Sequence, residues 1–139
     1  MNAKPEDTPS LDPQPQDAAI SEQVQVAVDA ALDHKAIQLK VLHLAPVTDF
    51  TDYFLIMSGS NSRQVQAIAD AVLEELGRRK VKPLHVEGQN QAHWVLLDYG
   101  DFVVHVFEEE RRGFYALERL WADAPDVTGE LTAGQPVAS

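Results

Sequence analysis

The sequence contains no cysteine, and none of its 139 residues belong to an uninterrupted apolar segment of the roughly 20 residues that a membrane-spanning helix needs. The lack of cysteine excludes disulfides, thiolate chemistry and cysteine-ligated zinc. The N-terminus has neither the basic and apolar regions of a secretory signal nor the arginine-rich character of an organellar transit peptide. We therefore expect a cytoplasmic bacterial protein without membrane contact.

Basic side chains are also scarce, and the formal net charge is −11. Residues 84–110 contain six acidic residues and neither lysine nor arginine. Such a segment repels a phosphate backbone, because nucleic-acid binding depends on basic side chains that displace counterions. We expect a basic protein as the partner and no specific recognition of nucleic acid.

Large apolar residues are rare at both ends of the chain. Residues 1–19 are rich in Pro, Asp, Gln and Ser, a composition that does not compensate for the entropy lost on ordering, and we predict a disordered acidic tail there. Residues 123–139 have a similar composition and are predicted to be a second disordered acidic tail. One domain over residues 20–122 remains between them.

Apolar periodicity divides this domain into helices and strands. A helix capped by Ser21 is followed by strands at 37–44 and 53–58. Apolar residues at helical spacing then predict a second helix, which begins after the turn Gly59–Ser62 and is closed by Gly77 and the basic residues Arg78, Arg79 and Lys80.

Further strands are predicted at 83–87, 93–97 and 102–107, the last two as an antiparallel hairpin, and a final helix from Glu108 to just before Pro125. A strand, a helix and a strand in succession imply a right-handed crossover in a partly parallel sheet. The expected fold is α/β, with a mixed five-stranded sheet and flanking helices.

The segment GSNSRQ, which begins at Gly59, is the feature most typical of an enzyme, because free amides at a helix N-terminus bind phosphate. Nucleotidyl transfer also needs two closely spaced carboxylates on a neighbouring strand, and no strand carries them. Capping of the helix by Ser60 or Ser62 is therefore favoured. The alternative is a small nucleotide-binding or nucleotidyltransferase-like enzyme that uses the Gly59–Ser60 turn.

The histidines on or beside the strands lack the spacing of a metal site, and we expect them to be hydrogen-bonded or partly exposed: His43, His85, His93 and His105. The G-x-S-x-G elbow of serine hydrolases is absent from the sequence. These patterns predict no catalytic residue, metal or cofactor, and so a protein that is not an enzyme.

Trp94 and Tyr115 are the strongest candidates for an interface. An indole on a hairpin can supply much of the energy of a protein contact, but strand alternation gives Trp94 an apolar complement on either face. Core packing and an interface are therefore equally consistent with the pattern around Trp94. Tyr115 points away from the apolar stripe that includes Phe114, which leaves its hydroxyl to face outward.

Three blocks of the chain, in this order and spacing, resemble the ribosomal silencing factor family, also called the Iojap or YbeB-like family (RsfS). They are TDYFLIMSGSNSRQVQAIAD, VEGQNQAHWVLLDYGDFVVHVF and EEERRGFYALERLW, and the resemblance covers residues 20–122. It implies an α/β fold similar to nucleotidyltransferases but without their catalytic acids. It also implies binding to large-subunit ribosomal protein uL14, where the factor blocks joining of the ribosomal subunits and represses translation under nutrient limitation.

The resemblance places the partner-binding positions on Trp94 and Tyr115. Further contributors, from the hairpin and the start of the last helix, are Asp98, Asp101, Glu108 and Glu109. Members of the family commonly carry an acidic residue directly before the tryptophan, where this chain has His93, so one negative charge is absent from that rim. A homodimer of the free protein, paired through the same hairpin, is a third interpretation.

Overall fold

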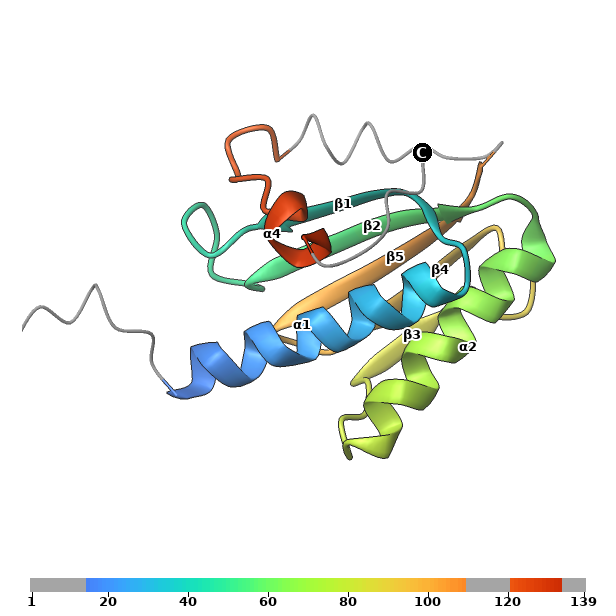
Figure 1. The fold of residues 1–139 in the computed structure, drawn as a ribbon, viewed down its shortest axis with the longest axis horizontal. Helices are drawn as coiled ribbons and strands as arrows, with labels where there is room; N and C mark the ends of the chain where they lie inside the picture. Colours follow the sequence, from blue (N-terminus) through green and yellow to red (C-terminus); the bar gives the residue numbers. More distant parts are fainter. Residues whose placement is uncertain (1–14, 110–120, 134–139) are drawn as a thin grey trace, which may run out of the picture.

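The computed structural model describes residues 15–109 and 121–133, and its secondary structure follows the predicted succession from the first helix to the last strand (Figure 1). Five strands form one sheet, and two long helices cover one of its faces. The elements are α1 (Pro15–Asp33), β1 (Ile37–His43), β2 (Tyr53–Gly59), α2 (Ser62–Arg78), β3 (His85–Glu87), β4 (Trp94–Asp98), β5 (Phe102–Glu108) and α4 (Thr128–Thr132).

The sheet has the strand order β1-β2-β5-β4-β3. Its central pair, β2 and β5, is parallel, and the other neighbouring pairs are antiparallel. The prediction of a mixed five-stranded sheet with helices is therefore confirmed. The crossover through α2 leads from β2 to β3, which lies at the edge of the sheet rather than beside β2. The further likeness to nucleotidyltransferases stays a prediction.

The helix face of the sheet, covered by α1 and α2, holds the larger apolar core. The predicted apolar stripe of α2 is buried there, including Ile68 and Leu76. It packs against aliphatic residues of the strands such as Leu55 and Val104. The hydrophobic spacing of α2 therefore predicted both its helical structure and the side that it buries. Within the described residues, neither long helix combines the length and hydropathy that a bilayer span requires.

Both long helices end in a way that the sequence did not reveal. Lys80, three residues beyond Gly77, adopts a φ of 64°, and the Val81 amide donates to the Leu76 carbonyl at 2.9 Å. This is a Schellman ending with lysine where glycine is usual. Lys35 has a φ of 67° at the equivalent position of α1. The predicted closure of α2 by Gly77 and the basic residues 78–80 is confirmed in position, because the helix ends at Arg78. The residue with positive φ is Lys80 rather than Gly77, which lies inside the helix.

The starts of the helices also differ from the prediction. The first helix begins at Pro15, so Ser21 is not its cap, and residues 15–19 are helical rather than part of a disordered tail. Proline is well tolerated in a first turn, where its missing N–H has no helical partner. At the start of α2, the cap is Asn61, whose Oδ1 accepts from the Gln64 amide at 2.9 Å. Capping by Ser60 or Ser62 was wrong.

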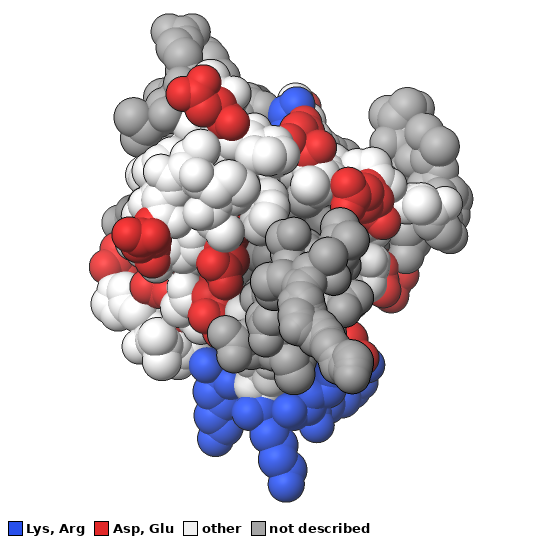
Figure 2. All heavy atoms as spheres, turned by 90° about the vertical axis from the view of Figure 1, so that its left-hand side faces the viewer, with Lys and Arg blue, Asp and Glu red and all other residues white. Residues whose placement is uncertain are grey.

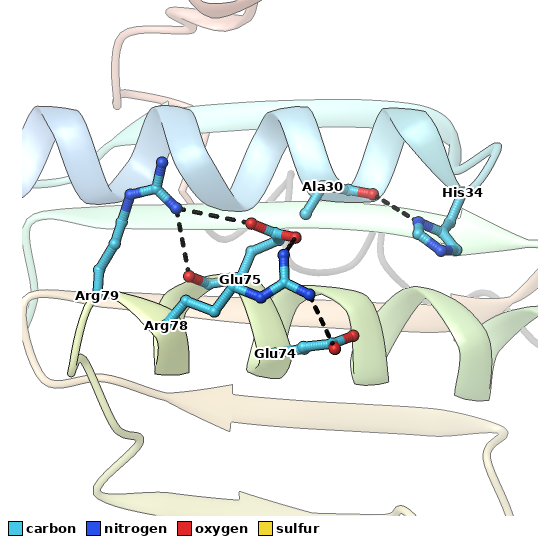
Figure 3. Close-up of polar contacts among 6 residues, drawn as sticks. All are labelled: Ala30, His34, Glu74, Glu75, Arg78 and Arg79. Atoms are coloured by element: carbon cyan, nitrogen blue, oxygen red, sulfur yellow. Dashed lines mark hydrogen bonds and ion pairs between the residues drawn. The ribbon is translucent and has the colours of Figure 1, made fainter.

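Figure 3 shows polar contacts along the two long helices. Arg78 is paired with Glu75 at 2.7 Å and with Glu74 at 3.1 Å, and Arg79 also reaches Glu75. His34, directly after the end of α1, has its Nδ1 3.2 Å from the Ala30 carbonyl oxygen. Exposed pairs of this kind contribute only a few tenths of a kcal/mol each, so packing on the helix face is the main source of stability.

The C-terminal segment is ordered further than predicted. The expectation of a disordered tail from residue 123 was wrong for residues 123–133, which include α4 and a bridge between Asp126 and Leu42. The Val41 amide donates to Thr128 Oγ1 at 2.8 Å, and Val127 packs against the main core. The predicted final helix from Glu108 lies mostly outside the described residues, because they do not include 110–120. At its two ends the prediction was wrong, since Glu108 is the last residue of β5 and residues 121–124 are not helical.

Candidate functional site

The sheet face opposite α1 and α2, named here the aromatic face, carries a band of rings. Strand pairing fixes its members, because residues directly opposite each other across a ladder point to the same side. Trp94 is opposite Phe107, and His105 is opposite both Leu96 and Ile56. The band continues through Phe54, Trp121 and Phe50, and aliphatic residues fill the spaces beside it: Leu42, Leu44, Ile56, Leu96 and Val103.

Trp94 is exposed on this face, with 49% of its surface accessible. Its indole stacks on Phe107, with the ring centroids 5.0 Å apart and the planes at 24°. Its Nε1–H donates to Nδ1 of His105 at 3.2 Å. The sequence could not decide between core and surface for Trp94, and the structure places it at the surface in a fixed orientation. A large ring held in this way is suited to binding, because little rotational freedom is lost on contact.

His105 contacts Trp94 and accepts the hydrogen bond of its indole. The sequence analysis did not distinguish His105 from the other histidines. Only 4% of its surface is accessible, and its Nε2 has no hydrogen-bond partner. Since Nδ1 accepts from Trp94, neutral His105 carries its proton on Nε2. Burial lowers the pKa of His105 to about 4, against the opposing influence of the Asp98 carboxylate. The prediction of a hydrogen-bonded or partly exposed histidine is therefore correct for Nδ1 and wrong for Nε2.

A hollow of about 480 Å³ lies beside Trp94. The loop Gly88–Gln91 forms its wall together with Val86, His93 and Trp94 itself. Gly88 is required in this loop, because its φ is 85° and a Cβ at this position would lie 2.0 Å from the Trp94 carbonyl oxygen. The loop thus fits closely against the backbone of Trp94. The hollow has the position and size to receive a side chain of a partner next to the indole.

Two of the predicted carboxylates lie at the same end of the sheet as Trp94. Glu108 is the last residue of β5, and its carboxylate is 2.8 Å from Nδ1 of His93. Glu109 follows and is exposed. His93 is therefore engaged with a carboxylate of the neighbouring strand. Glu109 is the more accessible negative charge at this rim.

The other two predicted carboxylates lie at the opposite end of the hairpin. Asp98 is the last residue of β4, four residues from Trp94, which corresponds to about 13 Å along a strand. Its Oδ1 accepts from the Gly100 amide at 2.8 Å, so it also holds the turn. Asp101 is exposed in the same turn. The structure therefore divides the predicted binding residues between two places on the molecule.

Tyr115 lies outside the described residues, as do the positions around it. Its predicted role at the interface stays a prediction. His105 and Phe107 could have been predicted from the sequence by pairing their strand with the strand of Trp94. The length of a hairpin turn determines which residues of the two strands lie opposite each other.

The GSNSRQ turn has a structural explanation. A Cβ on Gly59 would lie 2.8 Å from the Val65 amide nitrogen, so glycine allows β2 to approach α2 closely. Asn61 accepts from the Gln64 amide with its side chain and from the Val65 amide with its carbonyl. The side-chain oxygen and the carbonyl oxygen of Asn61 are therefore both engaged within the fold. Among the described residues, no group of three or more His, Asp or Glu side chains is arranged to hold a metal ion.

Comparison with known proteins identifies the family to which the chain belongs. Residues 17–138 match the sequence model of a family described as ribosomal silencing factor during starvation. The chain belongs to this family. Its members take part in the regulation of translation, as their name states, and this confirms the resemblance found in the sequence.

Three relatives show how far the similarity extends. Ribosomal silencing factor RsfS of Halalkalibacterium halodurans is 43% identical over 106 residues, which are 76% of this chain and 91% of the relative. Mitochondrial assembly of ribosomal large subunit protein 1 of the mouse is 28% identical over 101 residues, which are 70% of this chain and 44% of its own length. The crystal structure of a protein from Chromobacterium violaceum superposes with a TM-score of 0.70 at 33% identity, covering 74% of this chain and 86% of that one.

Proposed function

We propose that the protein binds uL14 on the large ribosomal subunit through Trp94 and the hollow beside it, and sterically blocks joining of the small subunit. Translation would then be repressed when nutrients are limiting. The observation that carries the proposal is the exposed indole of Trp94, which is held by Phe107 and His105 on the sheet face opposite α1 and α2. Steric blocking needs a durable contact and no catalytic group, which fits such a surface.

The charge of the protein supports a basic partner from the ribosome. With a net charge of −11, the chain is attracted to basic ribosomal proteins and repelled by bare RNA. Glu109, directly after β5, and Asp101, in the β4–β5 turn, supply exposed negative charge. The names of the relatives, ribosomal silencing factor and ribosomal large subunit assembly, also support the large subunit as the target. A ribosomal target implies a cytoplasmic location in a bacterium.

The test is co-sedimentation with isolated ribosomal subunits, followed by a rejoining assay. We expect the protein to sediment with the large subunit alone and to reduce the yield of joined ribosomes in proportion to its occupancy. Binding to both subunits alike, or joining at the normal yield while the large subunit is saturated with the protein, would refute the proposal. Preincubation with excess purified uL14 should remove the protein from the large subunit.

The free protein can also pair with its own copy through the same surface, which we propose as a state that competes with ribosome binding. Sedimentation velocity of the protein alone and with uL14 tests this. A dimer that gives way to a one-to-one complex is the expected result. A dimer that binds uL14 without dissociating would show that the two contacts use different surfaces.

A further inference from the structure

Phe50, in the loop between β1 and β2, is more exposed than Trp94, with 58% of its surface accessible. It belongs to the same aromatic face. Its ring centroid lies 5.9 Å from that of Phe54 and 5.5 Å from that of Trp121. Phe54 in turn contacts His105, which holds Trp94. The band of rings therefore runs across the sheet and is exposed at both of its ends.

The loop that carries Phe50 is held in place on the β4–β5 turn. Thr51 is buried, and its Oγ1 donates to the Gly100 carbonyl at 2.9 Å. The Asp52 amide donates to the Asp101 carbonyl at 2.9 Å. Phe50 is therefore presented on backbone that is already ordered, and binding through its ring costs little additional conformational entropy. Packing in the core does not explain why a phenylalanine is held in this exposed position.

Exposed carboxylates lie near Phe50, one beside it in the chain and one in the turn that the two hydrogen bonds join to its loop. Asp49 precedes it and is exposed, and Asp101 lies in the turn to which the loop is joined. Figure 2 views this end of the molecule and shows carboxylates spread across it, with lysine and arginine gathered along its lower edge, where α2 ends in Figure 1. We name Phe50, Asp49 and Asp101 the Phe50 patch. An aromatic ring with carboxylates around it fits a basic protein segment that carries an apolar side chain.

We propose that the Phe50 patch is a second anchor for the basic protein that Trp94 contacts. The inference rests on the proposed function, and it assigns Asp98 and Asp101 to this second contact rather than to the Trp94 hollow. A nucleic acid does not suit the patch, because phosphate groups would be repelled by its carboxylates. Two anchors at opposite ends of the hairpin also fix the orientation of the partner, which a single indole does not.

Quantitative binding to purified uL14 tests the proposal, with Phe50→Ala as the main variant. We expect its Kd to rise about tenfold, the effect of losing a well-presented aromatic contact. Because Phe50 touches Phe54 and Trp121, thermal unfolding must show that the variant is folded. The double variant Asp49→Asn and Asp101→Asn removes charge without removing packing. It should weaken binding about threefold at 0.05 M salt, mostly through the association rate, and by less at 0.3 M.

Asp70→Asn is the matched control, since Asp70 is an exposed carboxylate on α2, on the other side of the sheet. It should bind as the unchanged protein does. Wild-type affinity for Phe50→Ala and for the double variant, together with weakened Trp94→Ala, would overturn the second anchor and leave the proposed function standing. Failure of the unchanged protein to bind uL14 would overturn both.

Self-association provides the remaining outcome. If Phe50→Ala abolished the dimer of the free protein and left the affinity for uL14 unchanged, the Phe50 patch would be a contact between copies of this chain, and the proposal would be wrong. Sedimentation velocity on the same samples distinguishes this case. A dimer that is unchanged, with weaker binding to uL14, is the expected combination.

Discussion

The two faces of the sheet are built from different side chains and serve different purposes. The helix face is filled by α1, α2 and mostly aliphatic residues of the strands, with one stacked pair of rings, Tyr99 and Phe102, among them. The aromatic face holds stacked rings, a buried histidine with an unpaired nitrogen, and two aromatic side chains exposed to solvent. Exposed aromatic rings cost stability, and such a cost is typical of surfaces kept for binding. The unsatisfied nitrogen does not distinguish the two faces, because the buried Tyr99 hydroxyl on the helix face also lacks a hydrogen-bond partner.

The largest expected effect is on the helix face. Ile68 is fully buried between α2 and the sheet, and Ile68→Ala should lower the free energy of unfolding by about 4 kcal/mol, because it removes buried carbon and leaves a cavity. Urea unfolding measures the change. Binding to uL14 by the fraction that remains folded should be unaltered. A weaker intrinsic affinity of the folded variant would show that the two faces are coupled.

The buried histidine gives the aromatic face a pH dependence. The pKa of His105 is about 4 in the folded protein, below its ordinary value of 6.5, so the unfolded chain binds the proton first as pH falls. Stability from this group is complete above pH 6.5, declines between pH 6.5 and about 4, and is then constant. The loss is on the order of 3 kcal/mol.

Urea unfolding at pH 7 and pH 4.5 measures this decline. In His105→Phe the difference in the free energy of unfolding between the two pH values should be smaller by most of that amount, because the two proteins differ in this side chain alone. An unchanged difference would mean that His105 is protonated in the folded protein at pH 4.5. The substitution also removes the acceptor of the Trp94 indole, so binding to uL14 should weaken at neutral pH.

Trp94→Ala should separate binding from stability. Its indole is half exposed, and its removal should cost about 2 kcal/mol of binding free energy, a rise of roughly thirtyfold in the Kd for uL14. The free energy of unfolding should fall by less than this, because only the buried side of the ring packs on Phe107. Equal losses in both measurements would mean that Trp94 acts through the fold rather than at the contact. Calorimetry and urea unfolding on one preparation decide between these results.

The sequence predicted most of the helix face because that face depends on local spacing. The apolar stripe of α2 and the continuous run Tyr53–Ser58 both identify residues covered by other elements, and both are confirmed. The parallel pairing of β2 with β5 joins segments nearly 50 residues apart, and no local pattern reveals it. Without that pairing, the position of Phe54 beside His105, and hence the band of rings, could not be derived.

The candidate site was predicted in part. Trp94 was singled out because an indole on a hairpin can supply much of the energy of a protein contact, but its exposure depends on which side of β4 the helices cover. Phe50 was missed because its neighbours Asp49, Thr51 and Asp52 are typical of an ordinary loop. Its significance appears only when Thr51 and Asp52 are seen to join that loop to the β4–β5 turn. Distance along the strand likewise separates Asp98 from Trp94, which lie close in the sequence.

The smallest expected effect is a gain on the helix side. Lys80 has a φ of 64°, a conformation that is unfavourable for a residue with a Cβ and natural for glycine. Lys80→Gly should therefore raise the free energy of unfolding by about 0.5 kcal/mol, the relief of strain being partly offset by the greater freedom of glycine in the unfolded chain. Thermal unfolding measures the gain, and Gly77→Ala, at an exposed position inside α2, provides a comparison that stabilises through helix propensity instead. Because both positions lie at the end of α2, away from the aromatic face, neither variant should change the affinity for uL14. A loss of affinity in Lys80→Gly alone would show that the lysine charge contributes to the contact and that binding extends beyond the aromatic face.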